Sequence, residues 1–293
     1  MILFCGDPHG NFGHIIEAVQ EHRPTAVILL GDVQAQRPLE IELAPILTST
    51  EIWFIHGNHD TDTESDHDHL FGSKLADRNL HGRVVEIAGL RIAGLGGVFR
   101  GRVWAPPAPA KFENPKQYLA QCGKGNRWRG GLPLTQRSTI FPVDFETLKM
   151  QRADILVTHE AGSAHPHGFA AIDELARSLS VSKTFHGHHH DQRDYSAERT
   201  LLGFDAFGVG FRGIIDQDGD SILARVAADL GQSVLDDLGG LQMLKDRQRK
   251  DSEEIAAGLR SARSLLMVKK GDLEGFTVTP NPESKYNKPG EGW

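Results

Sequence analysis

The sequence predicts an α/β fold, and two of its features support this prediction. Short apolar segments alternate with segments of helical periodicity before residue 195, as in βαβ units with parallel strands. Polar motifs also follow the apolar segments at regular intervals, with Asp7, Asp32 and Asn58 spaced 25 and 26 positions apart, about one βα unit each. Because the carboxyl ends of parallel strands lie at one edge of a sheet, we expect these motifs to converge there.

The first strands and helices are predicted from the spacing of apolar residues. Ile15, Ile16 and Val19 recur at helical spacing, whereas short unbroken apolar runs indicate strands that are buried on both faces. Pro24 is expected to end the first helix, because proline lacks the N–H that a helix interior needs. In chain order we expect a strand over residues 2–5, a helix over 12–22, a strand over 26–30, a helix over 39–47 and a strand over 52–55.

The later segments continue this alternation. Gly89 lies between two short apolar runs, which predicts a hairpin, and the polar run at residues 216–220 is typical of a turn between antiparallel strands. We therefore expect a hairpin of residues 84–87 and 90–94, a helix over 145–152, a strand over 155–158, a helix over 170–179, a strand over 183–185, and an antiparallel hairpin of residues 201–215 and 221–226.

The length of 293 residues suggests either one large domain or one domain with appendages. We expect the main domain to span residues 1–228 and to contain an insertion at residues 98–141. Residues 229–270, where Leu, Ile and Met recur at mixed helical spacing among many charges, predict a helical appendage. Residues 271–293 are rich in Gly, Pro, Asn, Glu and Lys, a composition typical of a flexible tail.

Charge and cysteine content restrict the class of protein. The formal net charge of -7 disfavours a protein that coats nucleic acid without sequence preference, because such binding depends on cations that contact phosphates. Cys5 and Cys122 are too few for a disulfide framework, so we expect free thiols in a reducing cytoplasm. The N-terminus shows no leader pattern and no apolar run of 18 residues follows, which predicts a cytoplasmic protein without a membrane span.

Five short motifs supply oxygen and imidazole ligands for metal ions. They are Gly-Asp-Pro-His-Gly at residues 6–10, Gly-Asp at 31–32, Gly-Asn-His-Asp at 57–60, an isolated His159, and Gly-His-His-His at 187–190. Carboxylate, amide and imidazole donors suit Mn, Fe or Zn better than a metal that prefers thiolates. Two divalent ions need roughly seven or eight protein ligands, which the five motifs supply together. The sequence therefore predicts a two-metal site.

The order of these motifs resembles the pattern of the calcineurin-like metallophosphoesterase superfamily, D-x-H, G-D, G-N-H-D/E, H and G-H-x-H, over about residues 1–195. The resemblance implies a metallophosphoesterase-type sandwich of mixed β-sheets flanked by helices, here with the C-terminal helical appendage. It also implies a metal-dependent phosphoric ester hydrolase. On this resemblance, one cation is held by Asp7, His9, Asp32 and His190, and the other by Asp32, Asn58, His159 and His188.

The resemblance further implies how phosphate esters are hydrolysed. Two cations that share a water lower its pKa, so that a metal-bridging hydroxide attacks phosphorus while the cations neutralise charge on the phosphoryl oxygens. His59 corresponds to the family residue that faces the leaving oxygen, and we expect Asp60 to fix the tautomer of His59 and to raise its pKa. Mn is the cation we expect, with Fe, Zn and Ni as alternatives.

The insertion at residues 98–141 is the part of the chain that points to a substrate class. It carries eight Lys and Arg against Glu113 alone, a charge of +7. Aromatic residues are interleaved with these cations, a composition suited to stacking bases and holding phosphates. A nucleotide or nucleic-acid phosphodiester is therefore the expected substrate, and an ordinary basic surface loop is the alternative. The candidate substrate-binding residues are Arg100, Arg102, Arg127 and Arg129.

Two other functions remain open on the sequence alone. One is a phosphomonoesterase or protein phosphatase, although protein phosphatases of the superfamily carry an Asp-Arg pair where this chain has Ala35 and Gln36. The other is a phosphoesterase-fold partner or scaffold protein that docks in a larger assembly, or self-associates, through residues 229–270.

Several further polar residues lie near the motifs. An acidic run lacks the glycine and the terminal glutamate of a calcium loop, so we expect a solvated loop there; it comprises Asp62, Glu64, Asp66 and Asp68. We expect the other nearby histidines at the rim of the site or behind the ligands, with substrate contact by His165 or His167 left open. These histidines are His56, His165, His167, His186 and His189.

Overall fold

The computed structural model describes residues 1–222, which form two β-sheets and the helices that cover them. The first sheet has the strand order β10-β1-β2-β3, and the second has the order β4-β5-β6-β7-β9-β8. The strands are β1 (Ile2–Cys5), β2 (Ala26–Leu30), β3 (Glu51–Ile55), β4 (Arg83–Ile87), β5 (Leu90–Leu95), β6 (Ile155–Thr158), β7 (Lys183–His186), β8 (Arg193–Asp194), β9 (Asp205–Gly208) and β10 (Ile214–Asp216).

Both sheets are mixed. Strands β1, β2 and β3 are parallel, and so are β5, β6, β7 and β9, whereas β10, β4 and β8 each pair antiparallel to a neighbour. The α-helices are α1 (Gly13–His22), α2 (Leu39–Glu42), α3 (Glu64–Phe71), α4 (Pro115–Gln121), α5 (Pro142–Lys149), α6 (Ala170–Leu179) and α7 (Arg199–Leu202). Short 3-10 helices are η1 (His59–Thr61), η2 (Ala76–Arg78), η3 (Lys124–Asn126), η4 (Leu134–Gln136) and η5 (Ser196–Glu198).

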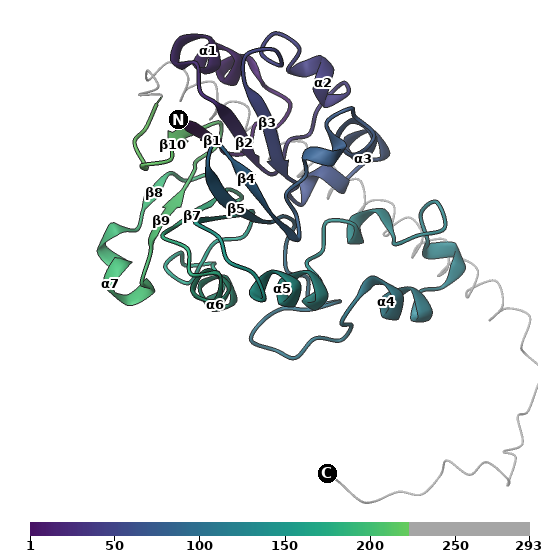
Figure 1. Cartoon of the computed structure of the whole chain (residues 1–293). Coiled ribbons are helices and arrows are strands. Elements are labelled where there is room, and N and C mark those ends of the chain that lie inside the picture. Colours follow the sequence, from purple (N-terminus) through teal and green to yellow (C-terminus); the bar gives the residue numbers. More distant parts are fainter. Residues whose placement is uncertain (223–293) are drawn as a thin grey trace, which may run out of the picture. The chain divides into compact units, whose positions relative to one another are not determined.

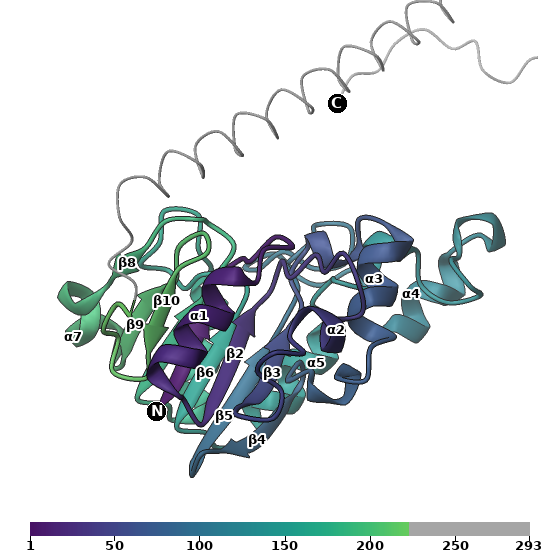
Figure 2. The ribbon, with the colours of Figure 1, turned by 90° about the horizontal axis from the view of Figure 1, so that it is seen from above.

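The sheets pack face to face, with helices on both outer surfaces (Figure 1). Helices α1, α2 and α3 cover the first sheet through one apolar cluster, and α5, α6 and α7 cover the second sheet through another. A third cluster fills the space between the sheets, where Phe4 and Ile28 of the first sheet meet Val157 and Phe185 of the second. Seen from above, α4 lies at one end of the molecule, away from both sheets (Figure 2).

Alternation along β1 explains why its residues are apolar without a break. Leu3 and Cys5 belong to the cluster under α1, whereas Ile2 and Phe4 belong to the cluster between the sheets. Successive side chains of a strand point to opposite faces, so a strand covered on both faces buries every residue. The unbroken apolar runs that predicted strands thus reflect the two-sided burial of this sheet.

The predicted fold class is confirmed, because the structure is a sandwich of two mixed sheets flanked by helices. Four elements coincide with their predicted limits, namely β1 at residues 2–5, β2 at 26–30, β6 at 155–158 and α6 at 170–179. The hairpin around Gly89 is confirmed as the antiparallel pair β4–β5. Strands β2 and β6 are buried along their whole length and α6 buries one face, so local apolar spacing was sufficient to predict them.

The predicted antiparallel hairpin of residues 201–215 and 221–226 is wrong in its first strand, and residues 223–226 of its second strand lie outside the described residues. Within it, β9 joins the second sheet parallel to β7, and β10 crosses to the first sheet and pairs antiparallel to β1. The ring of Phe207 stacks at 5.2 Å on Phe185, which holds β9 inside the second sheet. Of the predicted pairing, the described residues retain one isolated bridge between Ile215 and Ser221.

Two further expectations are corrected. The helix expected over residues 39–47 ends at Glu42, and the following residues form turns. The acidic run expected to be a loop forms most of α3, because Thr63 and Asp66 make a capping box in which each side chain accepts from the other's backbone N–H. The carboxylates Glu64 and Asp66 lie in the first turn of α3, where they complement the helix dipole.

The predicted domain end at residue 228, the helical appendage at 229–270 and the tail at 271–293 lie outside the described residues. Among residues 1–222, no helix combines the length and apolar character needed to cross a bilayer. Cys5, which is buried, and Cys122 are both free thiols. The cytoplasmic location stays a prediction.

Phe4 is expected to be a principal contact between the two sheets. Its ring is fully buried and stacks on Phe185 with a centroid distance of 3.9 Å and an interplanar angle of 5°. Phe4→Ala should lower the free energy of unfolding by about 3–5 kcal/mol, because it removes a large buried side chain and leaves a cavity. Urea denaturation measures this loss. Met150→Ala is the control, since Met150 is 86% exposed and should change stability by about 0.5 kcal/mol or less; equal losses in the two variants would contradict the packing argument.

Candidate metal centre

The carboxyl ends of five parallel strands carry the predicted ligands to one place. Strands β1, β2 and β3 run into the motifs of Asp7, Asp32 and Asn58, while β6 and β7 run into His159 and the run ending at His190. His188 donates its backbone N–H to both carboxylate oxygens of Asp7, at 3.1 and 2.8 Å. The predicted ligands are therefore brought together from both sheets.

The backbone at these strand ends is unusual. Five of the seven predicted ligands have a positive φ, namely Asp7 (35°), His9 (44°), Asp32 (45°), His188 (75°) and His190 (61°). Residues other than glycine rarely adopt this region, and each such residue costs roughly 1–3 kcal/mol unless its surroundings enforce it. Backbone hydrogen bonds enforce it here, for example from His9 N–H to the carbonyl oxygen of Asp32 at 3.0 Å. Such a concentration of unfavourable backbone angles is typical of a functional site.

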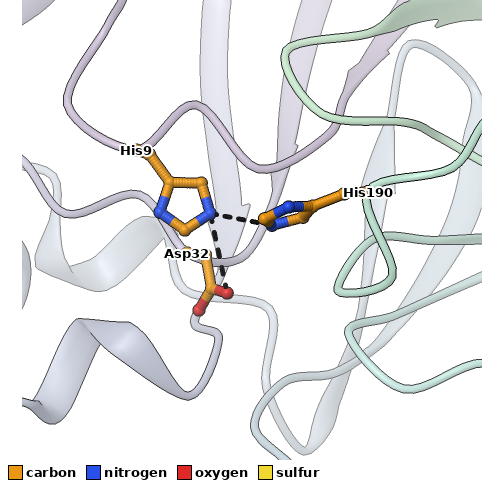
Figure 3. Close-up of side chains that lie close together, drawn as sticks. All are labelled: His9, Asp32 and His190. Carbon is orange, nitrogen blue, oxygen red and sulfur yellow. Dashed lines mark hydrogen bonds and ion pairs between the residues drawn. The ribbon is translucent and has the colours of Figure 1, made fainter. Parts of the chain in front are cut away.

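Figure 3 shows His9, Asp32 and His190 pointing toward one another. The Nε2 atoms of His9 and His190 are 3.1 Å apart, and His9 Nε2 lies 4.0 Å from an Asp32 oxygen. His9 Nδ1 lies 2.5 Å from the Oε1 atom of Gln34, an acceptor, so Nδ1 carries the proton and Nε2 presents a lone pair. One ligand atom from each residue lies within 4.8 Å of the others. A cation among these atoms would satisfy all three.

A second donor group lies beside the first and shares Asp32 with it. Its members are Asp32, His159 and His188, again with ligand atoms within 4.8 Å of one another. His159 Nδ1 lies 2.8 Å from the carbonyl oxygen of Leu30, so Nε2 is the atom that faces Asp32 at 3.3 Å and the Asn58 amide oxygen at 3.1 Å. An oxygen-rich point in front of an imidazole nitrogen is the arrangement that a divalent cation completes.

Burial makes the charge at this point unfavourable without a cation. Asp7, Asp32 and His159 are each at most 1% exposed. Burial raises the pKa of Asp7 to about 7, and the nearby Asp32 adds to that rise. Burial opposes protonation of His159, but the carboxylates of Asp32 and Asp7 outweigh it and raise the pKa of His159 to about 10. In the absence of metal, the imidazole therefore holds a proton where positive charge is needed.

Three glycines of the motifs leave room for these side chains. A Cβ on Gly31 would overlap the ring of His159, and a Cβ on Gly57 would overlap both His159 and Asp32. A Cβ on Gly187 would lie 2.8 Å from an Asp7 oxygen. Because these neighbours are themselves buried, they cannot move aside, which explains why these three motifs pair a polar ligand with glycine.

The expected contact between Asp60 and His59 is wrong. Asp60 is fully buried and accepts the backbone N–H groups of Gln34 and Gly57, each at 2.8 Å. The carboxylate that lies beside His59 is Asp62, at 2.6 Å from Nδ1, and this hydrogen bond is the main cause of the raised pKa of His59. The i, i+3 spacing across η1 is the sequence signal that identifies Asp62.

The candidate substrate-binding arginines lie in two kinds of environment. Arg127 donates to the carbonyl oxygens of Leu119 and Cys122 at the end of α4, and Arg129 pairs with Asp68 and Glu64 of α3. Both arginines thus hold the insertion together or fasten it to α3.

Arg100 and Arg102 differ from these two. Arg100 is half-buried and donates to the Ser138 hydroxyl at 3.0 Å, while its Nε is buried without a partner in the described part of the chain. Arg102 is exposed and lines a cavity of about 450 Å³ within the insertion. These two arginines are therefore the better placed to meet a ligand.

The remaining histidines lie around the donor groups. His165 is buried and stacks on His189 with a centroid distance of 3.8 Å, and His186 lies 3.1 Å from the Tyr195 hydroxyl oxygen. His56 is buried beside Asn79. His167 packs at 5.7 Å from His165.

A buried residue that sequence reasoning missed is Glu160, which directly follows His159 and is 3% exposed. One of its oxygens accepts the backbone N–H of Phe99 at 2.9 Å, and the other lies 4.0 Å from His188 Nε2. A charged residue two positions after the end of an apolar strand was the available signal.

Two donor groups that share one buried carboxylate, at the strand ends of a two-sheet α/β sandwich, are typical of a metal-dependent hydrolase. The calcineurin-like phosphoesterase family matches residues 1–192, and the chain belongs to this family. The protein is accordingly a metallophosphoesterase, a metal-dependent hydrolase of phosphoric esters.

The chain is also similar to one bacterial relative and to two solved structures. An uncharacterized protein of Haemophilus influenzae is 46% identical over 226 residues, which cover 77% of this chain and 98% of that protein. The crystal structure of TT1561 from Thermus thermophilus is 13% identical, with a TM-score of 0.48 and coverage of 76% of this chain and 98% of that one. A structure described as a novel phosphatase of Mycoplasma pneumoniae is 15% identical, with a TM-score of 0.36 and coverage of 72% and 71%.

Asp32 belongs to both donor groups, whereas His190 belongs to one. Asp32→Asn is therefore expected to reduce bound manganese from about two equivalents to fewer than one, and His190→Ala to about one. Elemental analysis of reconstituted and desalted protein measures these contents. Asp154→Asn, which changes an aspartate paired with Arg91 far along the chain, should keep both equivalents. An Asp32→Asn variant that keeps two equivalents would rule out the shared role of Asp32.

Proposed function

We propose that the protein hydrolyses phosphodiesters of nucleotide or nucleic-acid type at a two-metal site. The observation that carries this proposal is the position of Arg100 at the start of the basic insertion. Burial lowers the pKa of Arg100, and the nearby carboxylates of Asp62, Glu160 and Asp32 oppose that shift. Within residues 1–222, no carboxylate forms an ion pair with Arg100. A half-buried arginine beside the donor groups is suited to binding an anionic substrate.

The donor set supports the ligand assignment implied by the motifs. One cation would be held by Asp7, His9, Asp32 and His190, and the other by Asp32, Asn58, His159 and His188; oxygen and imidazole ligands suit Mn, with Fe, Zn or Ni as alternatives. When bound, two such cations supply an ionised water as nucleophile and neutralise charge on the phosphoryl group. The protein's own part is to hold the ligands rigidly, which the buried hydrogen bonds to Asp7 and Asp32 accomplish.

His59 is suited to protonate the leaving oxygen. Its backbone N–H donates to Asp32 at 2.8 Å, which fixes it beside the shared carboxylate, and its side chain is 44% exposed toward an incoming substrate. Asp62 accepts from Nδ1 and thereby leaves Nε2 to face the substrate. The role expected for Asp60 passes to Asp62, while Asp60 ties the loops of Gln34 and Gly57 together.

The cavity in the insertion supports a nucleoside-containing substrate. It is lined by Arg102, Phe112, Tyr118 and the polar residues Gln121 and Asn126, and its volume of about 450 Å³ falls in the range of small-molecule sites. Aromatic faces beside an arginine are suited to a base and a phosphate. Arg102 lies two residues from Arg100, so one short segment would contact both ends of a nucleotide ester.

The surroundings of the second motif disfavour a protein phosphatase. Ala35 is buried and its carbonyl oxygen accepts from His69 Nδ1 at 2.8 Å, and Arg37 pairs with Glu42 at 2.9 Å on the surface. No arginine at this motif is therefore directed at the donor groups among the described residues.

The proposal is tested with three chromogenic esters in the presence of Mn²⁺. We expect hydrolysis of bis(p-nitrophenyl) phosphate and of the p-nitrophenyl ester of thymidine 5′-monophosphate to exceed that of p-nitrophenyl phosphate, with the lower KM for the thymidine ester. Arg102→Ala should raise KM for the thymidine ester about 10-fold or more and leave the bis ester unchanged, because a hydrogen bond to a charged group contributes about 1.5–3 kcal/mol. Arg37→Ala is the matched control. Hydrolysis of the monoester alone would overturn the proposal.

Asp62→Asn is expected to move the alkaline limb of the kcat–pH profile to lower pH. The hydrogen bond to Asp62 raises the pKa of His59, so its loss leaves less imidazolium to donate a proton as pH rises. A dinucleotide diester, whose alcohol leaving group needs that proton, is the substrate to use. The profile for bis(p-nitrophenyl) phosphate should not move, because p-nitrophenolate departs unprotonated. A shift to higher pH, or equal shifts for both substrates, would refute the assigned role of His59.

A further inference from the structure

We propose that Glu160 is a positioning residue that orients His188 for metal binding and connects this ligand to the basic insertion. The proposal rests on the two-metal site proposed above. It concerns a residue outside the five ligand motifs.

The surroundings of Glu160 distinguish it from an ordinary buried carboxylate. Its Oε1 accepts the backbone N–H of Phe99 at 2.9 Å, so this oxygen is satisfied. Its Oε2 has no lysine or arginine within 4.0 Å among the described residues, and the side-chain nitrogen it approaches is Nε2 of His188, at 4.0 Å. A carboxylate buried to this extent is costly unless a cationic or N–H partner meets it.

His188 supplies that partner when its ring is correctly turned. An imidazole ligand typically donates its second N–H to a carboxylate or carbonyl, which fixes the tautomer and the ring orientation. Glu160 at Nε2 favours the tautomer with its proton on that atom, which leaves the Nδ1 lone pair for a cation. The backbone of His188 is already fixed by its N–H bond to Asp7, so rotation of the side chain suffices to shorten the 4.0 Å separation.

The other oxygen of Glu160 meets the base of the insertion. Phe99 precedes Arg100, and the adjoining residue Val98 forms a bridge with Thr139 at the far end of the insertion. The segments at which the chain enters and leaves the insertion, around Val98 and Thr139, therefore both lie next to the Phe99 N–H group that Glu160 accepts. Through its two oxygens, Glu160 joins the segment that carries the proposed substrate contact to a ligand of the metal site.

The same geometry allows one competing interpretation. Ligand atoms of Glu160, His188 and His189 lie within 4.8 Å of one another, so Glu160 could bind a cation directly. The two interpretations differ in stoichiometry, because a ligand to a separate ion changes the number bound, whereas a positioning residue changes the affinity of an ion that remains.

The test compares Mn²⁺ binding by the full chain and by Glu160→Gln, with free Mn²⁺ counted by electron paramagnetic resonance. Glutamine keeps an oxygen for the Phe99 N–H and removes the negative charge. We expect two Mn²⁺ equivalents in both proteins, with one dissociation constant raised about 10–100-fold in the variant and the other unchanged. Asp173→Asn is the matched control, since Asp173 is 4% exposed and accepts the backbone N–H of Ser163 at 3.2 Å.

Unchanged Mn²⁺ affinities in Glu160→Gln would overturn the proposal. Loss of one whole equivalent of bound Mn²⁺ at saturation would also overturn it, as would an equal loss of affinity at both sites together with a lowered Tm. Weakening of one site with the Tm of the control variant supports it. If the wild-type chain binds fewer than two equivalents of Mn²⁺, the proposed two-metal function is wrong. If the wild-type chain binds two equivalents and hydrolyses diesters, and Glu160→Gln has the same Mn²⁺ affinities, only the proposed role of Glu160 is wrong.

Discussion

The constraint on which this structure depends is the burial of two carboxylates, Asp7 and Asp32, at the meeting point of two sheets. Neither is more than 1% exposed, and each lies at a strand end whose backbone adopts a left-handed conformation. Burying like charges together is unfavourable unless positive charge accompanies them. Without metal, the protonated imidazole of His159 supplies part of that charge, and divalent cations bound there would displace the proton and supply the charge instead. The burial of these carboxylates thus lowers the stability of the fold, so the site is not explained by a contribution to stability.

Packing elsewhere in the fold offsets this loss of stability. Phe4 and Phe185 stack between the sheets immediately before the strands end, so a closely packed part of the core lies directly beneath the ligands. The glycines of the motifs allow the backbone of one strand end to approach side chains from another. A ligand from β2 and a ligand from β6 can therefore face the same point, because the core fixes the sheets and the glycines remove the steric barrier.

The sequence alone predicted those features that depend only on the residue types within a short segment of the chain. Two-sided burial makes β1 and β2 uniformly apolar, and ligand chemistry marks the strand ends, so both the sheets and the five motifs could be recognised. What failed depends on partners distant in sequence. Contacts between distant strands decide that β9 pairs with β7 and that β10 pairs with β1. The direction of one short 3-10 helix decides that Asp62, and not Asp60, lies beside His59. Neither is encoded in apolar periodicity.

The insertion shows most clearly why composition is an incomplete guide to function. Its many basic residues suggest non-specific binding of polyanions. However, Arg127 donates to carbonyl oxygens at the end of α4, and Arg129 pairs with carboxylates of α3. Their charges are used to fold and fasten the segment. The two candidate arginines that make no such contact, Arg100 and Arg102, lie in one short stretch next to the N–H group that Glu160 accepts. If Glu160 has the proposed role, substrate recognition and metal binding depend on the same few residues of backbone. A ligand that shifts this stretch would then also shift the ring of His188, and by linkage metal binding would alter the affinity of the insertion for that ligand.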